Sequence, residues 1–211
     1  ERTMHTFLGI TAELSAQELD LTALTTARYL YIEGYLATSP SARHAVAEAR
    51  SLAKAQGIKT ALTFSDPAMV QYARQGLEEL LDDGVDLLFC NEQEALMFTN
   101  TENLDAAIEI LKLKNQHIVI TQGANGAVII DPAQQFHVAG RHVDAVDTNG
   151  AGDAFAGAFL YAINAGLNLE TAAQLAILIS SEVVAQFGPR LAIESYTKLF
   201  EQFKNAQQEC A

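Results

Sequence analysis

Residues 147–153 read Asp-Thr-Asn-Gly-Ala-Gly-Asp, and this stretch decides how the rest of the chain is interpreted. An extended, alternating segment precedes it at 142–146, and a run rich in helix formers and small residues follows it at 154–160. This order predicts a strand, a sharp turn and the start of a helix. Two glycines that flank an alanine let the backbone turn and bring its N–H groups close to an anion. The aligned peptide dipoles add about half a positive charge at the helix start.

The second aspartate of the stretch falls in the first turn of the predicted helix, where an ionised carboxylate is favoured. We expect the backbone N–H groups there to form an anion hole, contributed by Gly150, Ala151, Gly152 and Asp153. An anion hole beside a carboxylate suits the transfer of a phosphoryl group to an alcohol, because the carboxylate can take the hydroxyl proton. Asp and Gly clusters before helices also occur as simple caps and turns, and that reading stays open for the turn alone.

Two other phosphate-binding motifs do not fit this chain. A Walker A loop requires a Gly-Lys-Ser/Thr triplet, which the sequence lacks. A dinucleotide fingerprint requires a Gly or Ala three residues after its second Gly, and Phe155 occupies that position. A Rossmann oxidoreductase is therefore disfavoured.

Residues 147–157, Asp-Thr-Asn-Gly-Ala-Gly-Asp-Ala-Phe-Ala-Gly, resemble the signature of the PfkB/ribokinase family of sugar and nucleoside kinases, in the form that adenosine kinases carry. The resemblance implies an α/β fold of the three-layer α/β/α ribokinase type with a mainly parallel sheet. It implies an ATP- and Mg²⁺-dependent kinase with Asp153 as the base toward a primary hydroxyl. An adenosine-like acceptor is favoured. A ribokinase- or fructokinase-type sugar kinase, and a non-catalytic nucleotide- or sugar-binding protein on the same fold, are the alternatives.

The same resemblance assigns further residues to the nucleotide. The sequence Asn-Glu-Gln-Glu that begins at Asn91 reads by itself as a helix cap, and it resembles the family's N-x-x-E motif, whose Glu, here Glu94, organises a magnesium-bound water. Thr121, Gly123 and Gly126 would by themselves make a hairpin turn, and they match a T-x-G-x-x-G segment that lies against the nucleotide in PfkB-type kinases.

Three more residues are implied by the resemblance alone. Arg2 matches an arginine that adenosine-kinase-like members place near the transferred phosphate, and arginine suits bidentate phosphate contact. Asp147 and Gly188 match backbone loops where many relatives hold a monovalent cation such as K⁺. Helix entry and exit turns explain the last two positions equally well.

Composition narrows the class of protein. The 211 residues are 49% hydrophobic and 18% charged, which allows a substantial core. No apolar run approaches the 18 or so residues of a membrane span. A net charge of −13 argues against a general nucleic-acid or anionic-membrane binder, because such binding depends on Lys and Arg. The two cysteines lie far apart and the histidines fit no zinc spacing, so we expect a reducing, cytoplasmic location.

Strand and helix signals alternate along the chain without a linker or repeat. We expect strands at 29–32, 58–64, 85–89, 118–121 and 127–130, and helices at 40–56, 66–81, 91–98, 104–113, 151–165, 170–187 and 193–204. This pattern predicts a mainly parallel sheet whose carboxyl ends carry Asn91, Thr121 and Asp147.

The domain prediction follows from the resemblance. We interpret 1–211 as the C-terminal, nucleotide-binding and catalytic part of a single ribokinase-like domain, with the family's N-terminal units and lid outside this sequence. The expected partner is a small sugar or nucleoside acceptor, and the expected state is a monomer or homodimer.

Overall fold

The computed structural model describes residues 7–209. Within them the chain divides into two compact units. Unit 1 comprises residues 7–121 and 130–134, and unit 2 comprises residues 122–129 and 135–209.

A six-stranded sheet has the order β1-β2-β3-β4-β5-β6. Its strands are β1 (Tyr29–Glu33), β2 (Lys59–Thr63), β3 (Leu87–Asn91), β4 (His117–Thr121), β5 (Gly126–Ile130) and β6 (Gln135–Ala139). The first four pair in parallel. The central strands are almost entirely buried, as the continuous apolar runs of parallel strands require. The predicted α/β class with a mainly parallel sheet is confirmed, and each of the five strands predicted between residues 29 and 130 has a counterpart.

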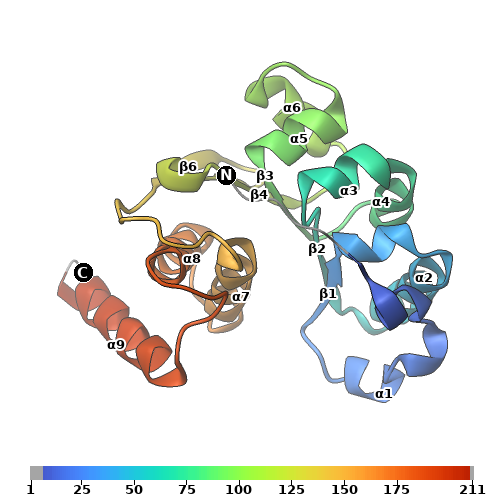
Figure 1. Cartoon of the computed structure of the whole chain (residues 1–211), viewed down its shortest axis with the longest axis horizontal. Coiled ribbons are helices and arrows are strands. Elements are labelled where there is room, and N and C mark those ends of the chain that lie inside the picture. Colours follow the sequence, from blue (N-terminus) through green and yellow to red (C-terminus); the bar gives the residue numbers. More distant parts are fainter. Residues whose placement is uncertain (1–6, 210–211) are drawn as a thin grey trace. The chain divides into compact units, whose positions relative to one another are not determined.

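The helices of unit 1 follow the predicted start and stop signals. They are η1 (Gly9–Glu13), η2 (Ala16–Glu18), α1 (Leu21–Leu24), η3 (Gly34–Thr38), α2 (Pro40–Gln56), α3 (Pro67–Tyr72), α4 (Arg74–Leu81), α5 (Glu92–Thr99) and α6 (Leu104–Leu111). Figure 1 shows α2 to α6 gathered along one side of β1–β4. At α2 the Ser39 hydroxyl accepts the N–H of Ala42 at 3.3 Å, Pro40 opens the helix, and Gly57 ends it with a φ of 68°.

The single helix expected at 66–81 was a wrong prediction, because two helices, α3 and α4, occupy that range. The break falls at Ala73, whose φ of −125° and ψ of 25° are not helical. After the break, Gly76 lies so close to η3 that a Cβ on it would come within 2.1 Å of the Ala37 carbonyl oxygen. The tertiary contact of α4 with η3 thus overrides a continuous helical pattern.

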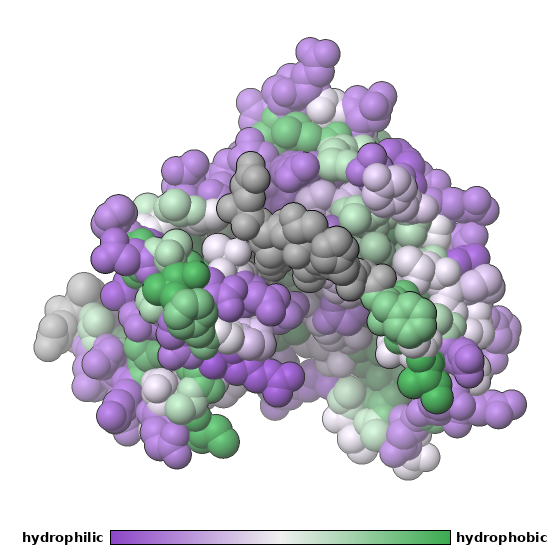
Figure 2. Space-filling view, in the orientation of Figure 1, coloured by the Kyte–Doolittle hydropathy of each residue, from purple (hydrophilic) through white to green (hydrophobic). Residues whose placement is uncertain are grey.

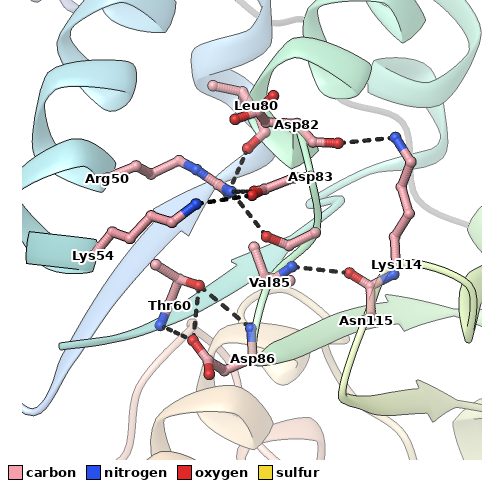
Figure 3. Close-up of polar contacts among 11 residues, drawn as sticks. Arg50, Lys54, Thr60, Leu80, Asp82, Asp83, Val85, Asp86, Lys114 and Asn115 are labelled. Atoms are coloured by element: carbon pink, nitrogen blue, oxygen red, sulfur yellow. Dashed lines mark hydrogen bonds and ion pairs between the residues drawn. The ribbon is translucent and has the colours of Figure 1, made fainter. Parts of the chain in front are cut away.

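A polar network lies near the amino-terminal ends of β2 and β3 in unit 1 (Figure 3). Arg50 of α2 donates to the carbonyl oxygens of Leu80 at 2.9 Å and Gly84 at 2.8 Å, and to the Asp83 carboxylate at 3.1 Å. Only 11% of the Arg50 side chain is exposed. Lys54 lies 3.2 Å from Asp83, and its hydrogen bond and charge hold the pKa of that carboxyl below its ordinary value. Arg50 therefore ties α2 to the end of α4.

The same network fixes the starts of the neighbouring strands (Figure 3). The carboxylate of Asp86, just before β3, accepts the amide of Thr60 at 2.7 Å and its hydroxyl at 3.0 Å. The side-chain oxygen of Asn115, just before β4, accepts the N–H of Val85 at 3.2 Å. These contacts hold the sheet edge opposite to the one where β3 and β4 end.

Unit 2 is built around a helix pair. Its helices are η4 (Gly123–Asn125), α7 (Ala151–Asn164), α8 (Leu169–Val184) and α9 (Ile193–Glu209). Buried side chains of α7 and α8 form its core, among them Phe155, Phe159, Leu175 and Ile179. Two or three helices were expected at the end of the chain, and three are present there, α7, α8 and α9.

The strand expected at 142–146 is absent, and irregular backbone precedes the turn at 147–153. The strand of this region is β6, which ends one residue before Gly140. The N–H groups of Val146 and Asp147 both donate to the Val184 carbonyl oxygen, at 2.9 Å and 3.2 Å. The end of α8, and not a strand neighbour, therefore satisfies this backbone, and Asp147 does not follow a strand as predicted.

The chain has a net charge of −13. On the face shown in Figure 2, hydrophilic residues surround separate groups of hydrophobic ones. None of the helices found between residues 7 and 209 has the length and apolar character that crossing a membrane takes.

Candidate active site

The turn before α7 is held by its own first aspartate. One carboxylate oxygen of Asp147 accepts the N–H of Asn149 at 2.9 Å, and the other accepts the N–H of Gly188 at 3.1 Å. The structure thus brings together Asp147 and Gly188, the two residues that the resemblance assigned to a monovalent cation. The contact they make is a hydrogen bond that joins the entry of α7 to the loop after α8.

The glycines of the turn have different roles. Gly150 has a φ of 75°, and a Cβ on it would come within 2.5 Å of the Pro189 carbonyl oxygen, so both conformation and packing require glycine there. A Cβ on Gly152 would meet nothing within 4 Å. The space over Gly152 is therefore open to a ligand. Glycine weakens a helix, and no protein contact at 152 accounts for its presence there.

Backbone donors point out of this turn without protein acceptors. The Ala151 N–H reaches the Thr148 carbonyl oxygen only at 3.4 Å. Within residues 7–209, the N–H groups of Gly150, Gly152 and Asp153 donate to no protein group. The first N–H groups of any helix lack intrahelical partners, and together with the helix dipole they attract an anion. The N–H groups of Gly150, Gly152 and Asp153 are therefore available to an anion, and the anion hole itself stays a prediction.

Asp153 is the third residue of α7 and is exposed. It lines a groove of about 630 Å³ in unit 2, together with Arg190 of the loop after α8. The groove is completed on α7 by Gly157, Ala158 and Tyr161, and on α9 by Tyr196 and Phe200. The carboxylate is thus accessible to a ligand and not enclosed in the core. Within the described chain, no group of three or more His, Cys, Asp and Glu side chains could hold a metal ion.

Asn91 and Glu94 form a reciprocal cap at the start of α5 in unit 1. The Asn91 side chain accepts the N–H of Glu94 at 2.8 Å, and the Glu94 carboxylate accepts the N–H of Asn91 at 2.8 Å. Glu94 is only 4% exposed. The cap that the sequence allows is present, so a role of Glu94 toward magnesium would come in addition to it.

Asn91 has a second neighbour among the predicted site residues. It is the last residue of β3, Thr121 is the last residue of β4, and the two are register partners in the parallel ladder. Both lie at the carboxyl edge of the sheet, as predicted. The adjacent Cys90 is buried, and burial, with a further contribution from the Glu94 charge, raises the pKa of its thiol well above the ordinary value.

The glycines after β4 differ in what surrounds them. Gly126 has a φ of 99°, and a Cβ on it would come within 2.0 Å of the Val138 carbonyl oxygen, so the contact with β6 requires glycine. Gly123 has a φ of 58°, and a Cβ on it would meet nothing within 4 Å. The Gln122 N–H donates to the Gly126 carbonyl oxygen at 2.8 Å and closes the predicted turn. Of these two glycines, Gly123 is the one that leaves open space for a nucleotide.

The remaining predicted residue, Arg2, lies outside the described residues. The sequence interpretation missed the groove-lining residues of α7 and α9. A signal existed, because Asp153, Gly157 and Tyr161 recur at intervals of four residues and so share one face of α7. The approach of α9 to that face had no such signal.

Comparisons with known proteins identify the family and the fold of this chain. Residues 1–195 match the family model described as pfkB family carbohydrate kinase. The ribokinase of Mus musculus is 34% identical over 172 residues, covering 77% of this chain and 50% of the relative. The crystal structure of adenosine kinase from Sinorhizobium meliloti has a TM-score of 0.85 and 34% identity, covering 90% of this chain and 59% of its own.

A further structure, described as a ribokinase II from E. coli in complex with ATP and Mg²⁺, has a TM-score of 0.80 and 25% identity over 90% of this chain and 64% of its own. These neighbours confirm the ribokinase-like fold. The chain spans about half the length of the curated relatives that it matches. Because the family model covers nearly all of the sequence, the chain belongs to the pfkB family of carbohydrate kinases.

Proposed function

We propose that the protein to which this chain belongs is an ATP-dependent kinase that phosphorylates a primary hydroxyl of a ribonucleoside or sugar, with Asp153 as general base. One observation carries the proposal. An exposed Asp153 carboxylate lies on the first turn of α7, beside backbone N–H groups that donate to no acceptor in the described part of the chain. Such a turn can bind a phosphate, and its carboxylate is free to accept a proton.

The reaction follows from these two features. The acceptor oxygen forms a bond to the γ-phosphorus as its proton passes to the Asp153 carboxylate. The bond between that phosphorus and the bridging oxygen breaks, and ADP leaves with the electron pair. The N–H groups of Gly152 and Asp153 stabilise the negative charge of the phosphoryl oxygens during transfer. The open space over Gly152 allows those oxygens to approach the backbone.

The residues present fit MgATP. A magnesium ion that is held mostly by phosphates and water needs only one or two carboxylates, and it would neutralise phosphate charge. We assign that contact, through water, to Glu94, whose position is fixed by the cap with Asn91. Thr121 and Gly123 are assigned to the nucleotide, and so is Gly126 through its backbone.

The monovalent-cation assignment rests on Asp147 and Gly188. Their hydrogen bond gathers two loop backbones whose carbonyl groups are suitable ligands for K⁺. Arg2 is retained as a phosphate contact by resemblance. The whole chain is proposed to be the nucleotide-binding and catalytic part of one ribokinase-like domain.

An adenosine-like acceptor is the first choice, supported by the Asp-Thr-Asn-Gly-Ala-Gly-Asp form of the signature and by the adenosine kinase neighbour. A ribokinase- or fructokinase-type acceptor is the second, supported by the ribokinase relative. The exposed Asp153 carboxylate speaks against a non-catalytic binding protein on the same fold.

ADP release tests the proposal. The protein that carries this chain is assayed with MgATP and, in turn, adenosine, inosine, ribose, fructose and fructose 6-phosphate. We expect ADP to form with at least one of these, most rapidly with adenosine. If ADP release stays at the acceptor-free rate with every acceptor while MgATP binds, the protein is a binding protein and the kinase proposal is wrong.

A further inference from the structure

The loop between α8 and α9 places an arginine in the groove that contains Asp153. Arg190 is exposed and lines this groove of about 630 Å³ in unit 2. It follows Pro189, the residue against which Gly150 packs. The loop that carries Arg190 is therefore in direct contact with the turn that carries the anion hole.

The backbone of this loop is held at several points. The side chain of Gln186 donates to the Arg190 carbonyl oxygen at 2.9 Å. The Leu191 N–H lies 3.5 Å from the Tyr196 hydroxyl of α9, and the Gly188 N–H donates to Asp147. These contacts tie the loop to the entry of α7 and to the start of α9. The backbone that carries the Arg190 side chain is therefore held beside the turn at 147–153.

The guanidinium group of Arg190 differs from those of the other arginines between residues 7 and 209, because it contacts no protein partner there. The other described arginines contact acidic side chains, carbonyl oxygens or other neighbours; these are Arg28, Arg43, Arg50, Arg74 and Arg141. Arg190 has no such partner in the described chain, and no ion pair within 4 Å joins it to Asp153. Two opposite charges thus line one groove without neutralising each other.

An unpaired guanidinium is a good ligand for phosphate oxygens. It presents several N–H donors in a planar fork and stays charged at all relevant pH values. In a chain with a net charge of −13, a phosphate needs a local cation to offset the repulsion. The free Asp153 carboxylate and the free Arg190 guanidinium are complementary to an acceptor hydroxyl and to a phosphoryl group, respectively.

We propose that Arg190 is a catalytic residue that binds the phosphoryl group as it passes from ATP to the acceptor. This inference rests on the proposed function. As the acceptor proton moves to Asp153 and the new oxygen–phosphorus bond forms, the bond to the ADP oxygen breaks and the electron pair stays on ADP. Arg190 contacts the phosphoryl and leaving oxygens and offsets that charge, which the neutral backbone donors of the turn do only in part.

The test compares Arg190→Ala, Arg190→Lys and Arg141→Ala in the full-length protein. Arg141 is a matched control, because it is an exposed arginine of the same unit that pairs with Glu182. We expect Arg190→Ala to lower kcat by about 10²–10³-fold, as loss of one transition-state donor does. Arg190→Lys should recover part of the rate, and added guanidinium ions should raise the rate of Arg190→Ala but not that of the control. Arg141→Ala should keep kcat within about two-fold.

Two other results would contradict the assignment of Arg190 to the transferred phosphoryl group. If Arg190→Ala keeps the wild-type kcat and KM while Asp153→Asn is inactive, the kinase function stands and the inference about Arg190 is overturned. If only the KM for fructose 6-phosphate rises, the phosphate that Arg190 binds belongs to the acceptor, and the assignment to the transferred group is wrong.

A binding measurement separates failure of the inference from failure of the proposed function. If the wild-type protein releases no ADP with any acceptor, the proposed function fails, and binding of MgATP and of inorganic phosphate decides the case of Arg190. Weaker binding of both by Arg190→Ala than by Arg141→Ala supports Arg190 as a phosphate ligand. Equal binding by the two variants overturns it.

Discussion

Gly150 lies against Pro189 so closely that a Cβ on the glycine would come within 2.5 Å of the proline carbonyl oxygen. Two residues further along the chain, Gly152 faces open space. The contact fixes the loop after α8 to the turn before α7, while the second glycine leaves the face of that turn uncovered. Packing and conformation therefore require glycine at 150, whereas no protein contact requires it at 152.

Alanine substitutions at these two glycines should have opposite effects on stability. Gly150→Ala should destabilise the protein by at least about 1–2 kcal/mol, because alanine must adopt a left-handed conformation and displace Pro189. Gly152→Ala should raise stability by about 0.5–1 kcal/mol, since it improves a helix without a clash. Its methyl group should nevertheless reduce kcat by obstructing the phosphate. Urea unfolding measures the change in stability, and ADP release measures the change in kcat. A fully active Gly152→Ala would contradict the proposal that a phosphate binds at this turn.

Asp153→Asn tests the general base. Asparagine is nearly isosteric and can still accept a hydrogen bond at the start of α7, but it cannot take the acceptor proton. We expect kcat to fall by about 10²–10⁴-fold with little change in ATP affinity. Stability should change by only about 0.3–1 kcal/mol, the charge–dipole contribution at an exposed helix start. Turnover that survives within a few-fold at saturating acceptor would mean that Asp153 is not the base.

Glu94→Gln separates the cap of α5 from a magnesium role. Glutamine keeps a side-chain oxygen that can accept the Asn91 N–H, so the cap should persist and the melting temperature should change little. The lost charge should raise the magnesium concentration needed for half-maximal rate more than it changes the KM of the acceptor. Titration of Mg²⁺ at fixed ATP measures this, with Asn91→Ala as a variant that breaks the cap itself. An unchanged magnesium requirement would leave Glu94 as a cap and nothing more.

Arg50→Met should destabilise unit 1 through its polar network. Methionine keeps much of the apolar stem, but it leaves the carbonyl groups of Leu80 and Gly84 without their donor. Loss of a largely buried charged donor should cost about 2–3 kcal/mol. Lys54→Met is the control, because 81% of that side chain is exposed and an exposed ion pair is worth about 0–1 kcal/mol. Equal unfolding midpoints for the two variants would contradict the role assigned to Arg50.

Cys90 should resist alkylation in the folded protein. Burial raises the pKa of its thiol, so the reactive thiolate is scarce even at pH 8.5, where an unfolded cysteine is about half ionised. For the same reason the unfolded state releases this proton first as pH rises, and stability should fall above about pH 8.5. Peptide mapping after iodoacetamide treatment, with and without urea, measures the protection. Rapid labelling of Cys90 without urea would show that the thiol is accessible.

Local signals in the sequence predicted the elements that depend on local chemistry. The start of α2 was predictable because Ser39 offers a side-chain acceptor and Pro40 has a fixed φ. Its end was predictable because Gly57 readily adopts a left-handed conformation. The break at Ala73 was not predictable in this way, since it depends on the contact between Gly76 and a carbonyl group far away in sequence.

The candidate site shows the same division. The turn at 147–153 was recognisable from residue types, although the backbone before it is held by the end of α8 and not by a strand. The corner at 187–190 was interpreted only as a cation-binding loop or a helix exit turn, and residue types alone gave the Arg190 side chain no role. Its place in the groove depends on how the loop after α8 packs against Gly150.

The pairing of Asn91 with Thr121 sets a limit on how this edge of the sheet can vary. Both residues end their strands at the same level of the parallel ladder, and neighbouring strands are about 4.8 Å apart whatever follows them. Insertions in the segments after β3 and β4 therefore leave the spacing of the two positions unchanged. An insertion of one residue within either strand would shift the register and turn every following side chain to the opposite face. The loops after β3 and β4 can therefore change in length and sequence while Asn91 and Thr121 keep their spacing.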